Sequence, residues 1–462
     1  MRKATGLPRT VPLWFFFLFS LLWAIVTILL AWSVKTSLSG SQGTGVTGEM
    51  ALEVAAFPEK VKTVYQDLSG YVTGRYEDES LRVERDPGAD YSGFRPLPTG
   101  SGPAVEGLLI EADPARMARG WRLLSGAFRI DGEIENAALL LSPDLEIVRQ
   151  WVLDEVPVGG SEPRPTHRKF VHGLEILDDG SLIFTFDGSI SLQRFDACGT
   201  RLWATPGDFH HAVTLDDSGE AVWTFFGDRI VEVAVEDGRI RRDISMEAII
   251  AANPKTDILG IRRAHATDLG RNSRDTEGTW MWDRFHLNDV DPLPAALAWR
   301  FDGFSAGDLV VSARSLNLIF VLDPDTLQVK WWRMGAVQRQ HDPDWLPNGE
   351  ILVLNNRMGE DFSEIVSIDP VTFERTTLFD GRENNFYTRI RGKQQRLNSG
   401  ALIVTSAQQG RAFEIDPTGE IALEIVNTKP GGEPLNYVIS DLRWLPPDAI
   451  DPRSWTCLPS NS

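Results

Sequence analysis

Histidines recur at one position of a repeated sequence pattern. The segments VHGLEILDDGSLIFTF, HHAVTLDDSGEAVWTF and QHDPDWLPNGEILVL each carry a histidine eight residues before a glycine, and an apolar run follows. These histidines are His172, His211 and His341. His286 occupies the same position in a copy that carries an insertion, whereas Gly392 replaces the histidine in another copy. Because the chain has only 7 histidines, their alignment at one position of the repeat predicts a shared site.

Clustered imidazoles support two kinds of chemistry. Neutral imidazole is a common metal ligand, and the carboxylates of HDPD at 341–344 offer additional oxygen ligands. Alternatively, one imidazole acts as a nucleophile while others serve as general acid or base, so that a chemical group is transferred. A histidine can also cap a turn, in which case the chain is a non-catalytic protein that binds a partner. From the residues alone, three functions remain possible: a metal-dependent hydrolase, a transferase, and a binding protein without catalytic activity.

Short β-strands are the elements that must position these histidines. Apolar runs alternate with Asp-Pro, Asp-Gly and Asn-Gly turn signals along the chain. A period of roughly 40–55 residues made only of strands indicates a β-propeller. Six copies, counted from AALLLSPDLEIVRQW at 137–151, predict an all-β, six-bladed propeller over residues 105–446. Residues that precede the innermost strand of each blade converge on the central channel.

The N-terminus predicts a single membrane anchor. Arg2, Lys3 and Arg9 precede a stretch without charge that ends at Lys35. About 20 apolar residues span a bilayer as a helix, and flanking basic residues favour the cytoplasmic side. This stretch is longer than the apolar region of a cleaved signal peptide, so an uncleaved anchor is favoured. The expected segments are a cytoplasmic tail at 1–12, the anchor at 13–34, a linker at 35–104 with a short helix at 51–72, the exported propeller, and a C-terminal tail at 447–462.

The net charge and the number of cysteines exclude some classes of partner and of site. The net charge is −19, with 46 basic and 65 acidic residues, which argues against nucleic acid as a partner. An anionic substrate therefore needs a local basic pocket. The two cysteines, Cys198 and Cys457, are too few for a disulfide scaffold or a cysteine-based metal site. Export permits them to pair, but the sequence decides neither their pairing nor the oligomeric state.

Three segments resemble one known family. RFHLNDV, DLVVSARSLNLIFVLD and QHDPDWLPNGEILVLNN, in this order, are similar to the bacterial arylsulfotransferases, and the resemblance covers roughly residues 165–425. Members of that family are exported six-bladed propellers. They move a sulfuryl group from an aryl sulfate to a phenol without a nucleotide sulfate donor. The resemblance thus implies aryl sulfates and phenols as substrates, and neither a cofactor nor a metal.

The resemblance also implies roles for individual residues. His341 matches the nucleophile, which becomes a sulfohistidine between two ping-pong half-reactions. His286 and Arg314 match the pair that holds the sulfate and assists the leaving group. His211 matches the remaining pocket histidine, with His172 as the alternative.

Weaker expectations concern residues around these positions. Asn355, Arg357 and Arg396 flank repeat strands and are candidate substrate contacts. The long connection at 246–285 is a candidate lid or partner surface. An insertion at 291–306, between the histidine of its repeat and the next strand, is expected to alter the mouth of the channel.

Overall fold

The structure is a computed structural model. It describes residues 13–38, 81–85, 88–99, 103–155, 169–261, 263–264, 279–280, 284–431 and 434–455. The chain divides into two compact units, one comprising Met1–Tyr76 and Arg262–Trp282 and the other comprising Glu77–Ile261 and Asp283–Ser462. The first unit contains helix α1 (Leu13–Leu38) and the short pair of β16 (Arg263–Ala264) and β17 (Thr279–Trp280). The predicted tail at 1–12 and the predicted helix at 51–72 lie outside the described residues.

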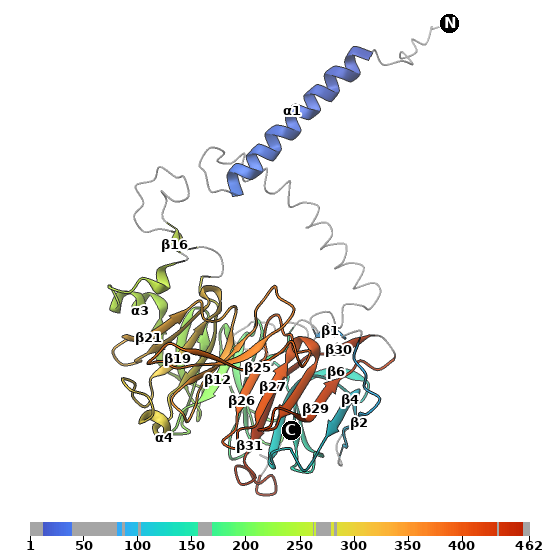
Figure 1. The fold of residues 1–462 in the computed structure, drawn as a ribbon, viewed down its shortest axis with the longest axis vertical. Helices are drawn as coiled ribbons and strands as arrows, with labels where there is room; N and C mark the ends of the chain where they lie inside the picture. Colours follow the sequence, from blue (N-terminus) through green and yellow to red (C-terminus); the bar gives the residue numbers. More distant parts are fainter. Residues whose placement is uncertain are drawn as a thin grey trace. The chain divides into compact units, whose positions relative to one another are not determined.

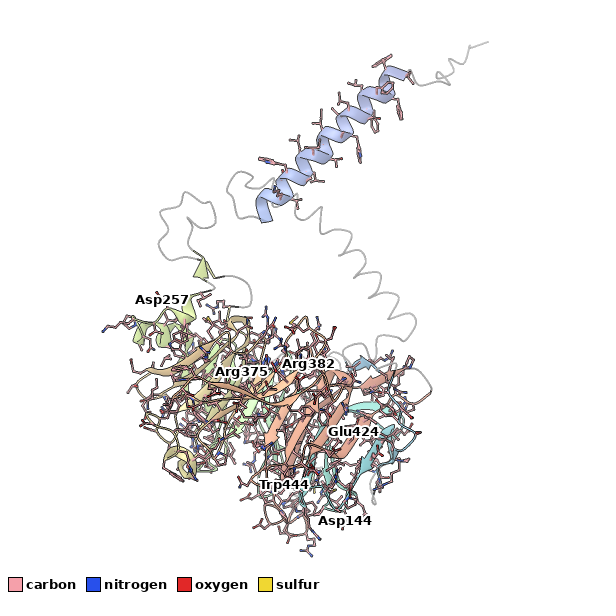
Figure 2. All side chains as sticks on the ribbon, in the orientation of Figure 1. Asp144, Asp257, Arg375, Arg382, Glu424 and Trp444 are labelled. Carbon is pink, nitrogen blue, oxygen red and sulfur yellow. The ribbon has the colours of Figure 1, made fainter. Side chains whose placement is uncertain are left out.

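Helix α1 has the properties of a membrane span (Figure 1). It has 26 residues, and the stretch Leu13–Lys35 has a mean hydropathy of 2.5. At 1.5 Å per residue, such a helix is long enough to cross the hydrocarbon core of a bilayer. Its large apolar side chains project outward on all sides (Figure 2), as Trp14 does with 66% exposure. The predicted N-terminal apolar helix is confirmed.

The second unit is a six-bladed β-propeller, which confirms the predicted fold class (Figure 1). Each blade contains four antiparallel strands, and the innermost strand comes first in blades 2 to 6. Blade 2 comprises β8 (Val171–Ile176), β9 (Leu182–Phe186), β10 (Ser191–Phe195) and β11 (Arg201–Pro206). Blade 3 comprises β12 (Phe209–Leu215), β13 (Ala221–Phe226), β14 (Arg229–Ala234) and β15 (Ile240–Ser245). Blade 4 comprises β18 (Leu287–Pro292), β19 (Leu309–Ala313), β20 (Leu318–Leu322) and β21 (Val329–Met334).

The remaining blades complete the ring. Blade 5 comprises β22 (His341–Trp345), β23 (Ile351–Asn355), β24 (Glu364–Ile368) and β25 (Arg375–Asp380). Blade 6 comprises β26 (Lys393–Arg396), β27 (Leu402–Ser406), β28 (Arg411–Ile415) and β29 (Ile421–Asn427). Blade 1 combines β5 (Trp121–Ile130), β6 (Glu133–Leu141) and β7 (Ile147–Val152) with an innermost strand from the other end of the chain, β31 (Ile439–Leu445).

The two ends of the propeller sequence close the ring by exchange. β31 pairs with β5, so the C-terminal part of the chain supplies the innermost strand of blade 1. In the opposite direction, β4 (Leu108–Ala112) pairs with β29 and extends the outer edge of blade 6. Short strands support this closure: β2 (Arg95–Pro96) on β4, β3 (Val105–Glu106) on β5, and β1 (Arg82–Glu84) on β30 (Leu435–Tyr437).

Apolar side chains between neighbouring sheets form the core. The middle strands of the blades are buried along their whole length in β19, β20, β23, β24 and β27. Val310 and Val321 of blade 4 pack with Ile351 and Val366 of blade 5 in one cluster, and similar clusters join other neighbouring blades. Non-directional burial of this kind is the main force that stabilises a fold. The resulting rigid ring holds the inner strands in fixed register.

A buried ion pair strengthens the closure between blades 1 and 6. Arg122 of β5 donates to Glu414 of β28 at 2.6 Å, and both side chains are fully buried. Removing one partner of such a pair typically costs about 3–5 kcal/mol, because the other charge stays buried without compensation. A substitution of either residue alone is therefore expected to destabilise this seam.

Two irregular segments differ from the repeat. After blade 3 come α3 (Met246–Ala252), which Ser245 caps, and the turn η3 (Ile258–Gly260). After β18 the insertion forms α4 (Ala295–Ala298). The described residues do not test the roles expected for these segments, which stay predictions. Cys198 is disulfide-bonded, and Cys457 lies outside the described residues.

Candidate active site

The histidines at the repeat position lie together in the channel. His172 belongs to β8, His211 to β12 and His341 to β22, and His286 immediately precedes β18. The ring centroids of His172 and His211 are 3.7 Å apart, and those of His211 and His286 are 5.1 Å apart. His172, His211 and His341 also line one small cavity of about 20 Å³. The structure therefore brings these four histidines close together, and their role as a shared site stays a prediction.

Bulges in the inner strands turn these side chains toward the axis. The pairing register shifts at the corresponding position in β8, β12, β18, β22 and β31. His211 and His286 have positive φ angles of 62° and 47°, which are uncommon for residues other than glycine. Bulges and such backbone conformations are concentrated at functional sites, where they re-aim a side chain.

Gly173 permits the close approach of two histidine strands. A Cβ atom at this position would lie 2.0 Å from the carbonyl oxygen of His211. Only glycine therefore allows β8 to run this near to β12. The contact between the His172 and His211 rings depends on that approach.

His341 is held by both of its ring nitrogens. Its Nδ1 lies 2.6 Å from Oδ1 of Asn356, and its Nε2 accepts a hydrogen bond from the backbone N–H of Arg391 at 3.2 Å. An atom that accepts from N–H carries a lone pair, so Nε2 is unprotonated and Nδ1 carries the hydrogen. His341 is thus a neutral imidazole with a nucleophilic lone pair on Nε2.

A second hydrogen-bonded chain fixes His211. Nε2 of His210 lies 2.8 Å from the carbonyl oxygen of Gly227, which can only accept, so this nitrogen carries the hydrogen. In a neutral His210 the Nδ1 atom must then accept. It lies 2.6 Å from Nδ1 of His211, which consequently donates. This leaves Nε2 of His211 with a free lone pair.

Burial keeps these imidazoles neutral. Desolvation, with a further contribution from the positive charge of Arg314, lowers the pKa of His341 to about 3. Burial also lowers the pKa of His172 and of His211 well below the ordinary value for imidazole, and nearby basic groups act in the same direction. A charged imidazole is unfavourable where water is excluded. At ordinary pH these rings offer lone pairs rather than positive charge.

Two arginines supply positive charge to the site. Arg314 begins the turn η4 (Arg314–Leu316), and its backbone N–H donates to the carbonyl oxygen of His286 at 3.0 Å. Arg391 lines the small cavity, and its guanidinium lies 3.4 Å from the ring centroid of Phe170. Burial lowers the pKa of Arg391 to about 10. Among the described residues, no carboxylate forms an ion pair with Arg391. Asp187 acts on Arg391 only through charge and forms no ion pair with it, and a partly buried guanidinium in this state is suited to bind an anion.

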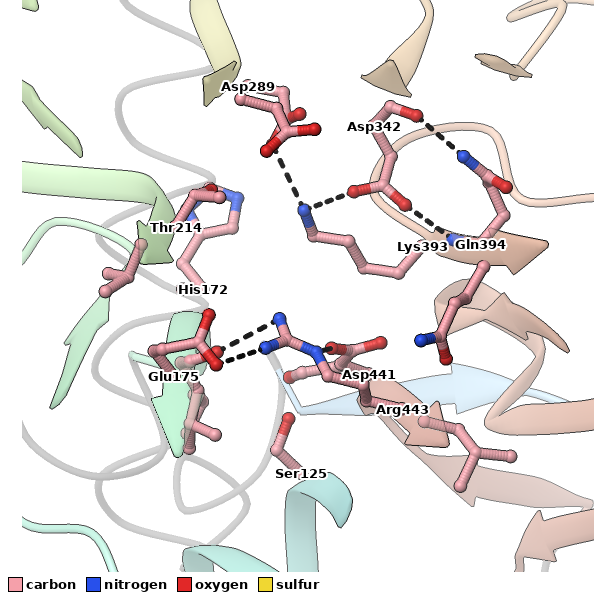
Figure 3. Close-up of a pocket in the computed structure, with 18 of the residues that line it drawn as sticks. Ser125, His172, Glu175, Thr214, Asp289, Asp342, Lys393, Gln394, Asp441 and Arg443 are labelled. Carbon is pink, nitrogen blue, oxygen red and sulfur yellow. Dashed lines mark hydrogen bonds and ion pairs between the residues drawn. The ribbon is translucent and has the colours of Figure 1, made fainter. Parts of the chain in front are cut away.

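A charged layer lies along the channel next to the histidines (Figure 3). Nζ of Lys393 contacts Asp289 at 3.2 Å and also pairs with Asp342, so it bridges blades 4 and 5. Arg443 donates to Glu175 at 2.7 Å in the same region. These residues line a larger cavity of about 250 Å³, and Lys393 and His172 line both cavities. Lys393 therefore marks the boundary between the two.

Two carboxyl groups of this layer have no cation beside them in the described part of the chain. Asp291 and Asp344 occupy corresponding positions of β18 and β22 and line the larger cavity. Burial, together with neighbouring carboxylates, raises the pKa of both well above the ordinary value. The two side chains thus bind protons more tightly than carboxyl groups in water do.

This gives a prediction for stability. Above pH 4 the folded chain holds a proton on Asp291 that the unfolded chain, with a pKa of 3.8 there, has released. Stability therefore falls as pH rises through this range, and asparagine removes that dependence. We expect Asp291→Asn to melt at the wild-type temperature near pH 4 and roughly 2–4 °C higher at pH 8. Thermal melts of this variant and of Asp302→Asn, an exposed control, test it; an equal difference at both pH values would contradict it.

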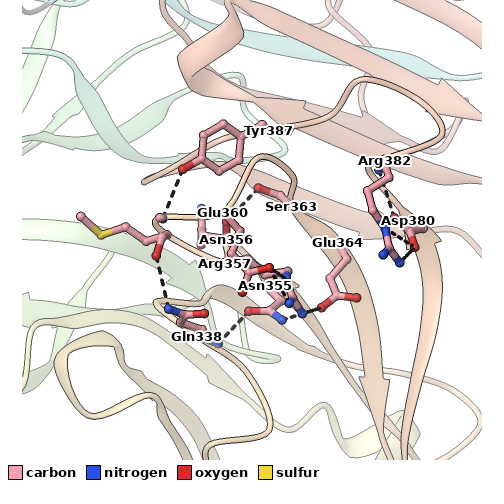
Figure 4. Close-up of polar contacts among 12 residues, drawn as sticks. Gln338, Asn355, Asn356, Arg357, Glu360, Ser363, Glu364, Asp380, Arg382 and Tyr387 are labelled. Carbon is pink, nitrogen blue, oxygen red and sulfur yellow. Dashed lines mark hydrogen bonds and ion pairs between the residues drawn. The ribbon is translucent and has the colours of Figure 1, made fainter.

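The three other residues proposed as substrate contacts lie away from the histidine cavity, and Figure 4 shows two of them, Asn355 and Arg357. Asn355 donates to Glu364 at 2.8 Å and accepts from the backbone of Gln338. Arg357 pairs with Glu360 and Glu364. Arg396 is exposed at the opposite end of β26 from Lys393. The structure does not bring these three residues into the histidine cavity, and a substrate contact by any of them stays a prediction.

The sequence interpretation did not select Asn356, Lys393 or His210 for the site. Arg391 precedes Gly392, the residue that replaces histidine in its repeat, which was the one available signal for it. Asn356 follows Asn355 and is distinguished from it only by the direction of its side chain. Within the described residues, no group of three or more histidine, cysteine or acidic side chains is arranged to hold a metal ion.

Comparison with known proteins assigns the family. The model of the family described as arylsulfotransferase (ASST) matches residues 173–428, which is more than half of the chain. The chain belongs to the arylsulfotransferase family. It is accordingly an arylsulfotransferase-like enzyme, for which the family implies aryl sulfates and phenols as substrates.

Other comparisons concern the fold. No curated protein matches the chain. Among solved structures, a protein of unknown function from Bacteroides caccae has 13% identity and a TM-score of 0.44, covering 70% of this chain and 98% of its own. Virginiamycin B lyase from Staphylococcus aureus has 12% identity and a TM-score of 0.33, covering 60% of this chain and 84% of its own. Matches at this level carry no functional argument.

Proposed function

We propose that this arylsulfotransferase transfers a sulfuryl group from an aryl sulfate to a phenol through a sulfohistidine at His341. The observation that carries the proposal is the hydrogen bond from Arg391 N–H to Nε2 of His341, because it identifies Nε2 as the nitrogen that carries the lone pair of a buried, neutral imidazole; this hydrogen bond must break before Nε2 attacks sulfur. A nucleophile that forms one covalent intermediate divides the transfer into two ping-pong half-reactions.

In the first half-reaction, Nε2 of His341 attacks sulfur and the bond from sulfur to the aryl oxygen breaks. The electron pair of that bond leaves with the phenoxide, to which His286 donates a hydrogen bond. The backbone N–H of Arg391 loses its acceptor once Nε2 is sulfurylated. It is then free to donate to a sulfuryl oxygen, as oxyanion-hole donors do.

Two guanidinium groups would stabilise the charge on the sulfuryl oxygens. Sulfuryl transfer, like phosphoryl transfer, spreads charge over three equatorial oxygens and is accelerated mainly by positioning and electrostatics. Arg314 and Arg391 present planar sets of N–H donors that fit such oxygens. The low dielectric of a buried cavity strengthens these interactions.

In the second half-reaction, the acceptor phenol attacks the sulfur of the sulfohistidine. Nε2 of His211 has a free lone pair and accepts the phenol proton. The sulfur–nitrogen bond then breaks, and its electron pair returns to His341. The phenoxide released in the first half-reaction takes its proton from solvent, and His211 returns the proton of the acceptor to solvent after the second, so the full cycle is balanced in protons.

We also propose that the propeller lies on the periplasmic or extracellular side of the membrane. Arg2, Lys3 and Arg9 precede the apolar helix and favour a cytoplasmic N-terminus. A single span then places everything after the helix on the other side.

The reaction is tested with the full-length protein and 4-nitrophenyl sulfate. We expect nitrophenol release to rise when phenol is added, with phenyl sulfate formed in an amount equal to the added release. A hydrolase that uses the same histidines would release nitrophenol without forming phenyl sulfate. Absence of phenol-stimulated release would contradict the proposed function.

A further inference from the structure

The amide of Asn356 is fully buried and its orientation is determined by its partners. Its Nδ2 donates to the carbonyl oxygens of Thr388 and Arg391 at 2.7 and 2.8 Å. Because carbonyls can only accept, the NH2 group must face these two atoms, and Oδ1 must face Nδ1 of His341.

This orientation determines which nitrogen of His341 carries the hydrogen. Oδ1 of Asn356 accepts a hydrogen bond and so requires the hydrogen on Nδ1. On the other side of the ring, the N–H of Arg391 requires a lone pair on Nε2. The same amide donates to the carbonyl oxygen of Arg391. One side chain thus holds the ring of His341 and also the backbone segment whose N–H donates to Nε2 of that ring.

We propose that Asn356 is the positioning residue that selects Nε2 of His341 as the atom that accepts the sulfuryl group. The inference rests on the proposed function, which needs an unprotonated nitrogen directed into the cavity. Without the amide, Nδ1 loses its acceptor and the backbone that directs the Arg391 N–H at Nε2 loses a hydrogen bond, so the preference for a hydrogen on Nδ1 over Nε2 weakens. In a catalytic triad, a histidine held in the wrong tautomer loses about 10⁴ in kcat.

Apart from Asn356, only the backbone N–H of Arg391 distinguishes the two nitrogens of His341, and Asn356 holds that backbone through the Arg391 carbonyl oxygen. Arg314, His286 and Lys393 act on His341 through charge, and all three disfavour its protonated form. They hold the ring neutral but do not distinguish its two nitrogens. His172, His211 and Arg391 line the same cavity, and only Arg391 contacts the ring through a hydrogen bond.

A matched control is available in the same loop. The Ser363 hydroxyl donates to the carbonyl oxygen of Asn356 at 3.0 Å and accepts from the N–H of Thr388 at 3.0 Å (Figure 4). Ser363→Ala therefore removes two hydrogen bonds of this loop and leaves the contact between amide and imidazole in place. Asn356→Leu is similar in size to the wild-type side chain and removes that contact.

The test reads the tautomer directly. Full-length protein with ¹⁵N-labelled histidine is examined by solid-state NMR in lipid, and His341→Ala assigns the His341 signals. We expect wild type and Ser363→Ala to show a protonated Nδ1 and a bare Nε2, and Asn356→Leu to show a mixture or the reverse. An unchanged tautomer in Asn356→Leu, or a wild-type ring protonated on Nε2, would overturn the inference.

Kinetics provide the second readout. We expect Asn356→Leu to lower kcat by roughly 10²–10⁴-fold with little change in KM, whereas Ser363→Ala stays within a few-fold of wild type. A parallel loss in both variants would indicate a structural role and overturn the inference. If the wild-type tautomer is as expected but no sulfuryl transfer occurs, the proposed function fails while the role of Asn356 stands. If Asn356→Leu does not fold, the wild-type spectrum still decides.

Discussion

Replacing His341 with alanine is expected to abolish sulfuryl transfer. His341 has both of its ring nitrogens held by hydrogen bonds, Nδ1 by Asn356 and Nε2 by the backbone of Arg391, which fixes the direction of its Nε2. Removing a nucleophile that cannot be replaced leaves only binding and electrostatic stabilisation, so the expected loss in kcat is at least about 10⁴-fold. Phenol-stimulated release of nitrophenol from 4-nitrophenyl sulfate measures it.

Two further measurements separate loss of the nucleophile from loss of the fold. The variant should retain a cooperative melt, because the ring has a small cavity beside it and carries no charge in the folded state. Wild type mixed with aryl sulfate in the absence of phenol should gain one sulfuryl group, detectable by mass spectrometry, and His341→Ala should not. His265→Ala serves as a control, since His265 lies outside the repeated segments. Activity of His341→Ala within tenfold of wild type would rule out the proposed nucleophile.

The architecture of the propeller could be predicted because its signals are local. Each blade encodes its own strands and turns, and the period of the repeat reveals the ring. The closure of blade 1 could not be predicted in this way. β31 and β5 are more than 300 residues apart in sequence, and nothing local in residues 439–445 indicates that they pair with residues 121–130. The segment at 137–151 marked blade 1 but not its innermost strand.

The histidines of the site could be predicted, whereas most of their partners could not. A repeat position identifies residues that face the channel, and the sequence assigned four histidines to it. His172, His211 and His341 occupy it, whereas the strand register places Asn288 there in blade 4 and His286 two residues earlier. Asn355 and Asn356 show the limit of this reasoning. They are adjacent, yet successive residues at the end of a strand point to opposite sides. Asn355 contacts Glu364 of its own blade, and only Asn356 contacts His341.

Blade 6 has Gly392 at the repeat position, and its contribution to the site could not be predicted from the sequence. Gly392 in blade 6 appeared to be a gap in the ring, but it has a positive φ of 97° and follows Arg391, which has a φ of 64°. This backbone directs the N–H of Arg391 to His341 while its side chain lies over Phe170. Blade 6 therefore contributes a donor and a cation where other blades contribute an imidazole.

Arg391→Gln is expected to lower kcat/KM for aryl sulfate by roughly 10²–10³-fold, the usual effect of removing one donor to a developing anion. Its guanidinium is partly buried, and among the described residues Asp187 interacts with it through charge without forming an ion pair, so its N–H donors are available to the sulfuryl oxygens. Arg391→Lys should restore less than a tenth of the loss, because an ammonium lacks the planar set of donors and the stacking on Phe170.

A control variant distinguishes the loss of a positive charge in the cavity from the loss of a positive charge on the surface. Arg389 is exposed and two residues away, so Arg389→Gln removes the same charge from the same loop without entering the cavity. We expect it to keep wild-type kinetics at moderate ionic strength, because surface charges are screened by salt. The backbone N–H of Arg391 remains in every variant, so His341 should keep its tautomer while the rate falls. Equal kinetics for Arg391→Gln and Arg389→Gln would mean that Arg391 does not bind the sulfuryl group, and that Arg314 alone supplies the positive charge.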